Sequence, residues 1–438
     1  MRLTIHRGSR EIGGSCIEVA AGPTRLILDV GMPLFDSNRE PFDSFSTRKA
    51  SRSDLIARGI IPAVPGLFDC AAAPPDAILL SHAHLDHSGL MHHSRPEIPI
   101  HATVGTSKMM LAGQVFAAGP GLSRDRYRPL WPGSTLRIGS ISVTPFAVDH
   151  SAFDSVSFLL EAEGRSLLYT GDLRMHGRKP DMARDLVRAV APKNVDALLV
   201  EGTHFGRANE RRIEETDVER VVTEKARSTH GLVLAAFSPQ DVDRLMSMYK
   251  AARKSKRVFV ADAYAAFVLH LAGGKIPKPT AANGIRVFFN AAFRRKRIRK
   301  LESLFAASRI ELSEILSAPD RHLMVFRPSM LGPDFGNKLP GGSTVIYSCW
   351  SGYLARPEWA AIQERLRASG GELHSAHASG HIHIPDLIRL VTQLNTKTVI
   401  PIHTFEPDRF RDHFRNVTML PDGIEHEIGG VGSDITTR

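Results

Sequence analysis

Cysteine is scarce in this sequence, and long apolar runs are absent from it. The three cysteines, Cys16, Cys70 and Cys349, lie far apart and in no CxxC spacing, which argues against both a disulfide framework and a thiolate zinc site. No apolar run reaches the length of about 18 residues that a transmembrane helix needs, and the amino terminus has no apolar signal-peptide core. We therefore expect a cytoplasmic protein with no membrane partner, in which nitrogen and oxygen atoms hold any metal.

Internal repeats and low-complexity linkers are also missing, and the overall composition is that of a folded protein. Of the 438 residues, 42% are hydrophobic and 23% are charged, which predicts two or three domains, or one large domain with an insertion. The 56 basic and 46 acidic side chains give a net charge of +10. This charge favours a polyanionic partner without proving one, since many basic enzymes bind no nucleic acid.

Short apolar segments that end in a polar or charged side chain recur up to about residue 205. This pattern predicts strands, and strands commonly deliver site residues at their carboxyl ends. We therefore expect one shared site at a sheet edge. The segments 25–28, 77–80, 146–148, 166–169 and 197–200 lead into Asp29, Ser81-His82, Asp149-His150, Thr170-Gly171-Asp172 and Glu201.

The pattern changes at about residue 206. A strand at 231–237, a helical periodicity over 242–249 and a strand at 258–260 predict a parallel βαβ unit. Ser238 is the expected N-cap of that helix, with Pro239 as its first residue. We expect a first domain formed by residues 1–205 and 361–438, and a second α/β domain, 206–360, inserted into it.

The strongest chemical signal is the run His82-Ala83-His84-Leu85-Asp86-His87. In a strand-to-helix turn, His82 and His84 can bind one metal while Asp86 and His87 face a second metal nearby. A solvated polar loop is the alternative interpretation, but three histidines and an aspartate in six residues are rarely only structural. The run therefore predicts a two-metal hydrolytic site.

The same run matches every specified position of HxHxDH, so the chain resembles the metallo-β-lactamase superfamily. The resemblance implies an α/β fold, the αββα sandwich, and two Zn²⁺ per chain, at sites that also accept Mn²⁺. It places Asp29 behind the histidine loop, where it would orient the loop. The implied ligands are His82, His84 and His150 for the first metal and Asp86, His87 and His403 for the second, with Asp172 bridging both.

The 231 residues between Asp172 and His403 leave room for an entire inserted domain, an arrangement that resembles the β-CASP nucleases. Their additional motifs have counterparts here in Glu201, His381 and His403. Segments 11–14, 150–155 and 377–381 are similar to the ribonuclease J group in particular. That group carries an additional carboxyl-terminal domain that assists oligomerisation, whereas this sequence continues for only 35 residues after His403. The oligomeric state, including a homodimer, therefore stays open.

The expected activity is that of a metal-dependent ribonuclease on single-stranded RNA, exo- or endonucleolytic. Two metals would lower the pKa of a bridging water, supply hydroxide near neutral pH and neutralise charge in the transition state. The expected catalytic residues are Asp86, His381 and Glu201. His381 would protonate the departing oxygen while Glu201 keeps its imidazole charged; the alternative is an ordinary loop histidine.

Several further residues are expected to contact substrate phosphates. His377, Ser379 and Gly380 precede His381 on one loop, where glycine allows close backbone approach. Ser238 would offer a second phosphate site at a helix N-terminus, although plain capping explains it as well. Arg294, Arg295, Lys296 and Arg297 open a basic run to Lys300, which either tracks a phosphate backbone or is merely solvated. Trp350 and Tyr353 either stack on a base or belong to the core.

Three other activities remain as alternatives. A histidine at position 403 accompanies RNA substrates in the β-CASP resemblance, whereas the related DNA nucleases carry valine there, so a DNA nuclease is disfavoured. A small-molecule hydrolase of the lactonase or thioesterase type would lack the insertion and the His-x-Ser-Gly-His segment. A non-catalytic RNA-binding scaffold would have lost metal ligands, and none is missing here.

Overall fold

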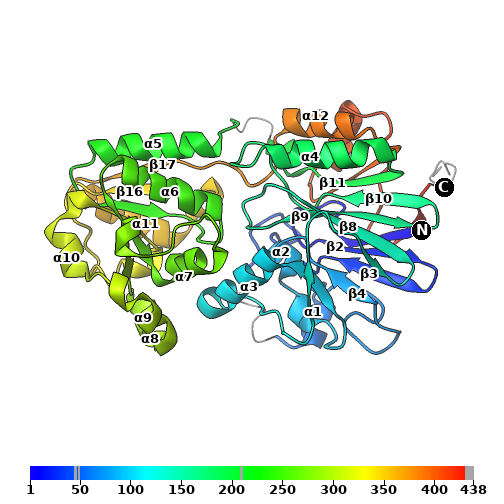
Figure 1. Cartoon of the computed structure of the whole chain (residues 1–438), viewed down its shortest axis with the longest axis horizontal. Helices are drawn as coiled ribbons and strands as arrows, with labels where there is room; N and C mark the ends of the chain where they lie inside the picture. The colour runs from blue at the N-terminus through cyan, green and yellow to red at the C-terminus, as the bar shows by residue number, and fades with distance from the viewer. Residues whose placement is uncertain (44–46, 48–49, 208–210, 430–438) are drawn as a thin grey trace. The chain divides into compact units, whose positions relative to one another are not determined.

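The computed structural model describes residues 1–43, 47, 50–207 and 211–429. The chain divides into two compact units, each built around its own core (Figure 1). The first unit comprises Met1–Met175, Lys179–Arg211 and Gly380–Arg438, and the second comprises His176–Arg178 and Arg212–Ser379. Among the described residues, no helix combines the length and the apolar character needed to cross a membrane.

Two mixed sheets form the first unit. The seven-stranded sheet has the order β19-β1-β2-β3-β4-β5-β6, and the six-stranded sheet has the order β18-β11-β10-β9-β8-β7. The strands of the first sheet are β1 (Arg2–Arg7), β2 (Cys16–Ala21), β3 (Thr24–Leu28), β4 (Ala77–Leu79), β5 (Ile100–Thr103), β6 (Tyr127–Leu130) and β19 (Glu425–Glu427). Those of the second are β7 (Leu136–Ile138), β8 (Ile141–Ala147), β9 (Val156–Ala162), β10 (Arg165–Tyr169), β11 (Ala197–Glu201) and β18 (Thr398–Ile402).

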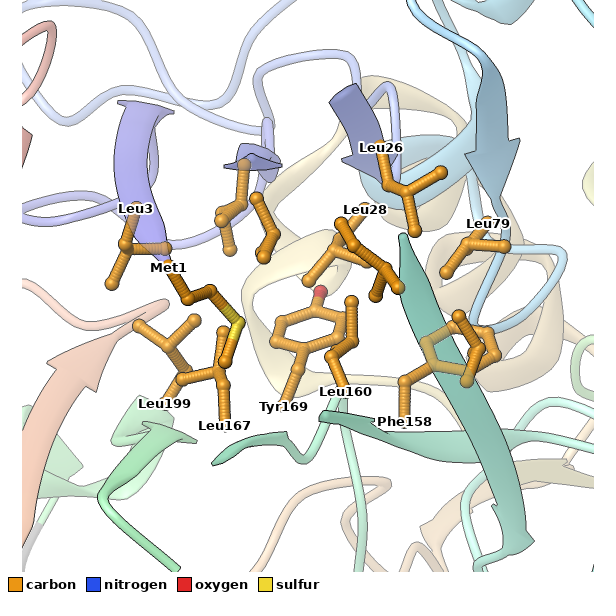
Figure 2. Close-up of a cluster of buried hydrophobic side chains, with 14 of the residues drawn as sticks. Met1, Leu3, Leu26, Leu28, Leu79, Phe158, Leu160, Leu167, Tyr169 and Leu199 are labelled. Carbon is orange, nitrogen blue, oxygen red and sulfur yellow. The ribbon is translucent and has the colours of Figure 1, made fainter. Parts of the chain in front are cut away.

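The core of the first unit lies between these two sheets. Figure 2 shows Leu26 and Leu28 of β3 facing Leu160 of β9 and Tyr169 of β10. Alternate residues along β9 and β10 point into this layer, as the period of two in a strand requires. Each fully buried leucine contributes about 1.5–3 kcal/mol through removal of its apolar surface from water.

Helices cover the outer faces of the sandwich (Figure 1). On the second sheet, Leu186 of α4 (Asp181–Val190) and Leu390 of α12 (Ile384–Leu394) pack with Leu168 and Leu198 in a separate cluster. On the first sheet, α3 (Val104–Ala117) contacts β5. Two shorter helices, α1 (Arg52–Ala57) and α2 (Leu85–Ser88), lie on that side as well. The expected αββα sandwich is therefore confirmed.

A single parallel sheet of the order β14-β13-β15-β12-β16-β17 forms the second unit. The expected strand, helix, strand sequence is present as β12, α6 and β13, with β15 between the two strands. The strands are β12 (Val233–Ala236), β13 (Val258–Asp262), β14 (Ile285–Phe288), β15 (His322–Val325), β16 (Thr344–Tyr347) and β17 (Glu372–Ser375). The helices are α5 (Glu215–Ser228), α6 (Val242–Lys254), α7 (Ala263–Ala272), α8 (Ala291–Lys296), α9 (Arg299–Phe305), α10 (Leu312–Ser317) and α11 (Pro357–Ala368).

Two details of the second unit differ from the sequence prediction. The boundary drawn at residue 360 falls inside α11, and the unit continues to Ser379 because β17 pairs with β16 of the same sheet. Ser238 is not the N-cap of α6. That helix begins at Val242, and the Asp241 side chain caps it by accepting a hydrogen bond from the Arg244 amide, since Ser238 lies one turn too early.

Candidate metal centre

The candidate metal ligands meet at one edge of the two sheets because their strands run in a common direction. β3 and β4 are parallel neighbours, and so are β10, β11 and β18. β8 shares this direction, because both it and β10 are antiparallel to β9. Every predicted ligand belongs to the first unit and follows the carboxyl end of one of these strands.

Three groups of side chains at this edge could hold a metal ion, and within each group the ligand atoms lie within 4.8 Å of one another. Asp172 belongs to the second and third groups, as does His403, so these groups adjoin. The groups are His82, His84 and His150; Asp86, His87, Asp172 and His403; and Asp172, Glu201, His381 and His403. The structure thus brings together all seven residues predicted as ligands.

Hydrogen bonds fix which ring nitrogen of His82 and which of His150 keeps its lone pair. His150 donates from Nδ1 to the carbonyl of Gly380 at 2.6 Å. The hydroxyl of Ser81 donates to Asp29, so it accepts from His82 Nδ1 at 3.0 Å. Both residues therefore present a bare Nε2, and the His150 Nε2 lies 3.1 Å from His84 Nδ1. Such outer hydrogen bonds are typical of metal-binding histidines.

Histidines of the second group are oriented in the same way. His87 donates from Nδ1 to Asp29 at 2.7 Å, and its Nε2 lies 3.1 Å from Asp172. The Nδ1 of His403 contacts the Thr203 hydroxyl at 3.0 Å, while its Nε2 lies 3.2 Å from Asp86. The His403 backbone is left-handed, with φ of 53°, a conformation that a non-glycine residue adopts only where its surroundings hold it.

Asp29 is the residue that ties the histidine loop to the sheets. Its carboxylate accepts hydrogen bonds from the Ser81 amide, the Ser81 hydroxyl and the Tyr169 hydroxyl, at 2.7, 2.7 and 2.6 Å, in addition to the bond from His87. It is fully buried and has φ of 59°. A carboxylate with this many donors orients several partners at once, among them a candidate metal ligand, His87.

The chemistry of the donor set fits divalent cations. Among the described residues, His82 Nε2 and Asp172 Oδ1 are buried atoms without a hydrogen-bond partner, and such atoms are costly unless something binds them. Burial and the neighbouring imidazoles hold the pKa values of His82 and His150 well below their ordinary range. These two imidazoles are therefore neutral, which is the metal-binding form. Imidazole and carboxylate donors suit Zn²⁺.

Glu201 and His381 form a pair beside the ligands. His381 Nδ1 lies 3.0 Å from Glu201 Oε2 and 3.7 Å from Asp172 Oδ2. Glu201 is fully buried, and its other oxygen accepts from the Leu173 amide at 3.0 Å. Although burial alone lowers it, Glu201 and Asp172 raise the pKa of His381 to about 9. The imidazole is therefore able to carry a proton at neutral pH.

Close packing explains the glycine before His381. A Cβ atom on Gly380 would lie 2.3 Å from the Ser151 hydroxyl oxygen and 3.2 Å from a His150 ring carbon. Since the Gly380 carbonyl also orients His150, the loop approaches that ligand through its backbone. A side chain at this position would therefore displace Ser151 and crowd His150, whatever role the glycine has toward a phosphate.

The other predicted phosphate contacts belong to the second unit, whereas the ligands belong to the first. His377 Nδ1 accepts a hydrogen bond from Arg244 at 3.1 Å, and the Ser379 carbonyl accepts from His176 at 2.9 Å. Ser238 is exposed. The residues of the basic run, Arg294, Arg295, Lys296 and Arg297, are all exposed on and just after α8. Arg294 is also paired with Asp334 at 3.2 Å.

Sequence reasoning missed three residues that support the ligands. Ser81 and Thr203 directly adjoin predicted site segments, so their positions at strand ends were an available signal. Tyr169 gave no such signal, because it is an apolar-looking residue inside a core strand. Its hydroxyl reaches Asp29 only through the packing of one sheet on the other.

Comparison with known protein families identifies a related domain in this chain. The Beta-lactamase superfamily domain matches residues 57–231, a segment that contains the HxHxDH run, His150, Asp172 and Glu201. These residues therefore form a metallo-β-lactamase domain. The chain is also a homologue of β-CASP ribonucleases, as the following relatives indicate.

The relatives differ in how much of each chain they cover. Ribonuclease TTHA0252 of Thermus thermophilus is 30% identical over 253 residues, 53% of this chain and 51% of its own length. Ribonuclease J of Pyrococcus abyssi is 23% identical over 98% of this chain and 93% of its own length. A protein of unknown function from Enterococcus faecalis V583 superposes with a TM-score of 0.76 at 21% identity, covering 97% of this chain and 99% of its own. The similarity to the Enterococcus faecalis structure shows a shared fold.

Proposed function

We propose that this protein is a metal-dependent ribonuclease that hydrolyses phosphodiester bonds of single-stranded RNA. The observation that carries the proposal is the position of Asp172, which shares a ligand group with Asp86, His87 and His403 and lies 3.9 Å from both His82 Nε2 and His150 Nε2, with the Glu201–His381 pair beside it. The ribonuclease names of the relatives and the net charge of +10 support an RNA substrate. In this proposal the first unit is the metallo-β-lactamase domain, and the second is an inserted β-CASP domain.

We propose that each chain binds two Zn²⁺ ions, at two sites that can also accept Mn²⁺. His82, His84 and His150 would hold the first ion, Asp86, His87 and His403 the second, and Asp172 both. Bound there, the ions would supply an activated water near neutral pH and neutralise charge on the phosphate under attack. Asp29 keeps His87 in the tautomer that presents Nε2.

The chain's own contribution to bond cleavage is a proton. A carboxylate accepts hydrogen bonds, so Glu201 holds the Nδ1 proton of His381, and Nε2 is left to donate to the departing oxygen. His381 is suited to meet a substrate because 20% of its side chain is exposed, whereas Glu201 is fully buried. The Thr203 hydroxyl lies 3.3 Å from the same Nδ1 and further fixes the ring.

The RNA would be held through its phosphates. We propose contacts from His377, Ser379 and Gly380 on the loop before His381, from Ser238, and from the exposed run at Arg294, Arg295, Lys296 and Arg297. These contacts would serve either cleavage from an RNA end or internal cleavage. A circular RNA substrate separates the two modes, since it has no end and can be cut only internally.

The deciding experiment is incubation of the purified protein with 5′-labelled single-stranded RNA and with DNA of the same sequence. We expect cleavage of the RNA, its loss on chelation, and its recovery when Zn²⁺ or Mn²⁺ is returned. The His84→Ala variant, purified in parallel, controls for contaminating nucleases. Chelator-resistant cleavage, or equal cleavage by the variant, would overturn the proposal, and preferential cleavage of the DNA would assign a DNA nuclease instead.

A further inference from the structure

The second unit contains a topological switch point in its parallel sheet. β12 and β16 are neighbours, but the chain leaves β12 through α6 toward β13, and it leaves β16 through α11 toward β17 on the opposite side. α6 contacts β13 and β15, whereas α11 contacts β17 (Figure 1). In open parallel sheets, ligands bind outside the carboxyl ends of the strands at such a point.

A cavity of about 590 Å³ lies at this point. Its walls come from residues at or just after the carboxyl ends of β12, β15 and β16 and from the start of α11, all within the second unit. A volume of this size suits a small organic molecule rather than a single ion. None of the metal ligands of the first unit lines it.

Aromatic side chains form one part of the wall. Tyr347 and Trp359 pack edge to face with ring centroids 4.8 Å apart, and the Tyr347 hydroxyl donates to the Trp350 carbonyl at 2.7 Å. Both residues are buried and belong to the core, so this part of the wall is rigid. Tyr353 is half-buried and lies nearer the surface. Such rings offer planar apolar surfaces to a planar ligand.

Two guanidinium groups form another part. Arg327 makes two hydrogen bonds to Asp262, at 2.5 and 3.2 Å, which hold its guanidinium in a fixed orientation. The guanidinium carbon of Arg356 lies 4.2 Å from the centre of the Tyr353 ring. Since Asp262 neutralises Arg327, the positive charge available to a ligand is chiefly that of Arg356. Arg356 is exposed and therefore able to turn toward a ligand.

We propose that this cavity binds one nucleotide, with its base against the Tyr353 side and its phosphate at Arg356 and Arg327. A purely apolar ligand would make no use of the positive charge of Arg356, and an inorganic anion would leave the aromatic wall uncovered. A base joined to a phosphate meets both parts of the wall. The nucleotide is either free in solution or a member of a bound RNA, and in the second case the inference rests on the proposed function.

The first test is titration of adenosine 5′-monophosphate into the chelator-treated full-length protein by calorimetry, so that the metal centre contributes no binding. We expect saturable binding that Arg356→Ala and Tyr353→Ala each weaken by about tenfold or more, since each removes a charged or stacking contact. The matched control is Arg309→Ala, which removes an arginine lying 5.6 Å over the Phe289 ring elsewhere in the unit. Absence of binding, or equal affinity in all four proteins, would overturn the proposal.

A second measurement uses the unaltered protein and so does not depend on the folding of a variant. Cys349 lines the cavity and is partly buried, whereas Cys70 is exposed in the first unit. We expect the monophosphate to slow alkylation of Cys349 and to leave that of Cys70 unchanged, as mass spectrometry of the labelled peptides would report. An unchanged rate at Cys349 under saturating nucleotide would contradict the assignment. Protection by inorganic phosphate alone would reduce the site to an anion site and overturn it too.

Two arms distinguish the sources of the nucleotide. If it belongs to the RNA, Arg356→Ala raises the KM for single-stranded RNA, and an abasic RNA of equal length removes that difference. If it is free, the variant loses nucleotide binding but keeps the KM for RNA. Hydrolysis of bis(nitrophenyl) phosphate, which has no base, reports the metal centre separately in every variant. If the unaltered protein binds the nucleotide but does not hydrolyse this substrate, the proposed function alone is contradicted. If it hydrolyses the substrate but does not bind the nucleotide, the nucleotide site alone is contradicted.

Discussion

Arg244 and Glu215 form a fully buried ion pair in the second unit, with two parallel hydrogen bonds of 2.8 and 3.1 Å. The same guanidinium donates to the carbonyls of Ser348 and Ala378, both at 2.9 Å. Ala378 lies in the segment that leads to His381, so one buried arginine fastens that segment to the sheet of the second unit.

Replacing Arg244 by methionine should destabilise the second unit by about 3–5 kcal/mol, because Glu215 would be left buried and unpaired. Hydrogen exchange of the amides at 376–379 should rise, as mass spectrometry would detect. The control Arg309→Met removes an exposed pair with Glu311 and should change stability by less than about 1 kcal/mol. Unchanged exchange in the Arg244 variant would show that the segment is held by other contacts.

Glu18 provides a test of stability against pH in the first unit. Burial alone raises the pKa of Glu18, but hydrogen bonds from His6 and Arg25 lower it to about 2. Because the folded value is depressed, the stabilisation is complete above the ordinary value of 4.5 and is lost as the pH falls from there toward 2.

Glu18→Gln should therefore lower the free energy of unfolding, measured in urea at pH 7, by at most about 3 kcal/mol. The difference from the unaltered protein should vanish near pH 2. Glu425→Gln is the matched control, since Glu425 pairs with Arg2 across two strands but is 54% exposed. It should cost about 1 kcal/mol or less at any pH. A difference for Glu18 that stays constant with pH would mean that its ion pairs do not stabilise the fold.

Metal content tests the two ligand groups. The purified protein should hold two equivalents of metal by elemental analysis, and Asp172→Ala should lose more than His84→Ala because Asp172 adjoins both sites. The variant His101→Ala, at a half-buried histidine outside the three groups, should keep both equivalents. Full activity with fewer than one equivalent per chain would refute a two-metal centre.

Local patterns were enough to predict short strands that end in polar residues at a shared sheet edge, whereas the αββα sandwich was predicted from the resemblance of the HxHxDH run to the metallo-β-lactamase superfamily. Asp29 and Glu201 were identified because each ends a short apolar strand, a signal contained in five or six residues. The extent of the second unit was not predictable in this way, since β17 is exposed or half-buried throughout and its sequence shows no alternation.

Hydrogen-bond partners that depend on tertiary packing could not be predicted from the sequence either. The bond from Tyr169 to Asp29 joins residues 140 positions apart, and nothing near Tyr169 distinguishes it from a core residue. The cap of α6 was misplaced because Ser238 and Asp241 are both good capping residues, and the turn from Ser238 to Asp241 decides between them.

The basic run of the second unit predicts a salt effect. Arg295, Arg299 and Lys300 are exposed, and changing all three to alanine should flatten the slope of log affinity against log salt by up to about two units for single-stranded RNA. Arg294 is left unchanged because it pairs with Asp334, and Arg297 because its backbone is left-handed, with φ of 51°.

The matched control for this experiment is the triple alanine variant of Arg184, Arg188 and Arg220, which are equally exposed but paired within their own helices. It carries the same change in net charge and should leave the slope nearly unaltered. Equal slopes for both triple variants would return the basic run to an ordinary solvated surface.

The last prediction separates proton donation from metal binding, because His381 and His403 share the Thr203 hydroxyl and both adjoin Asp172. As a proton donor held by Glu201, His381 should be dispensable for metal. His381→Ala should then keep both metals and the RNA affinity while slowing cleavage by about 10²- to 10⁴-fold. His403→Ala should instead lose the second metal. On a nitrophenyl phosphodiester the His381 defect should shrink, since that leaving group needs no proton, whereas the His403 defect should persist. Loss of metal from His381→Ala, or an equally large defect on the activated substrate, would make His381 a ligand or a positioning residue, in keeping with its place in the third group.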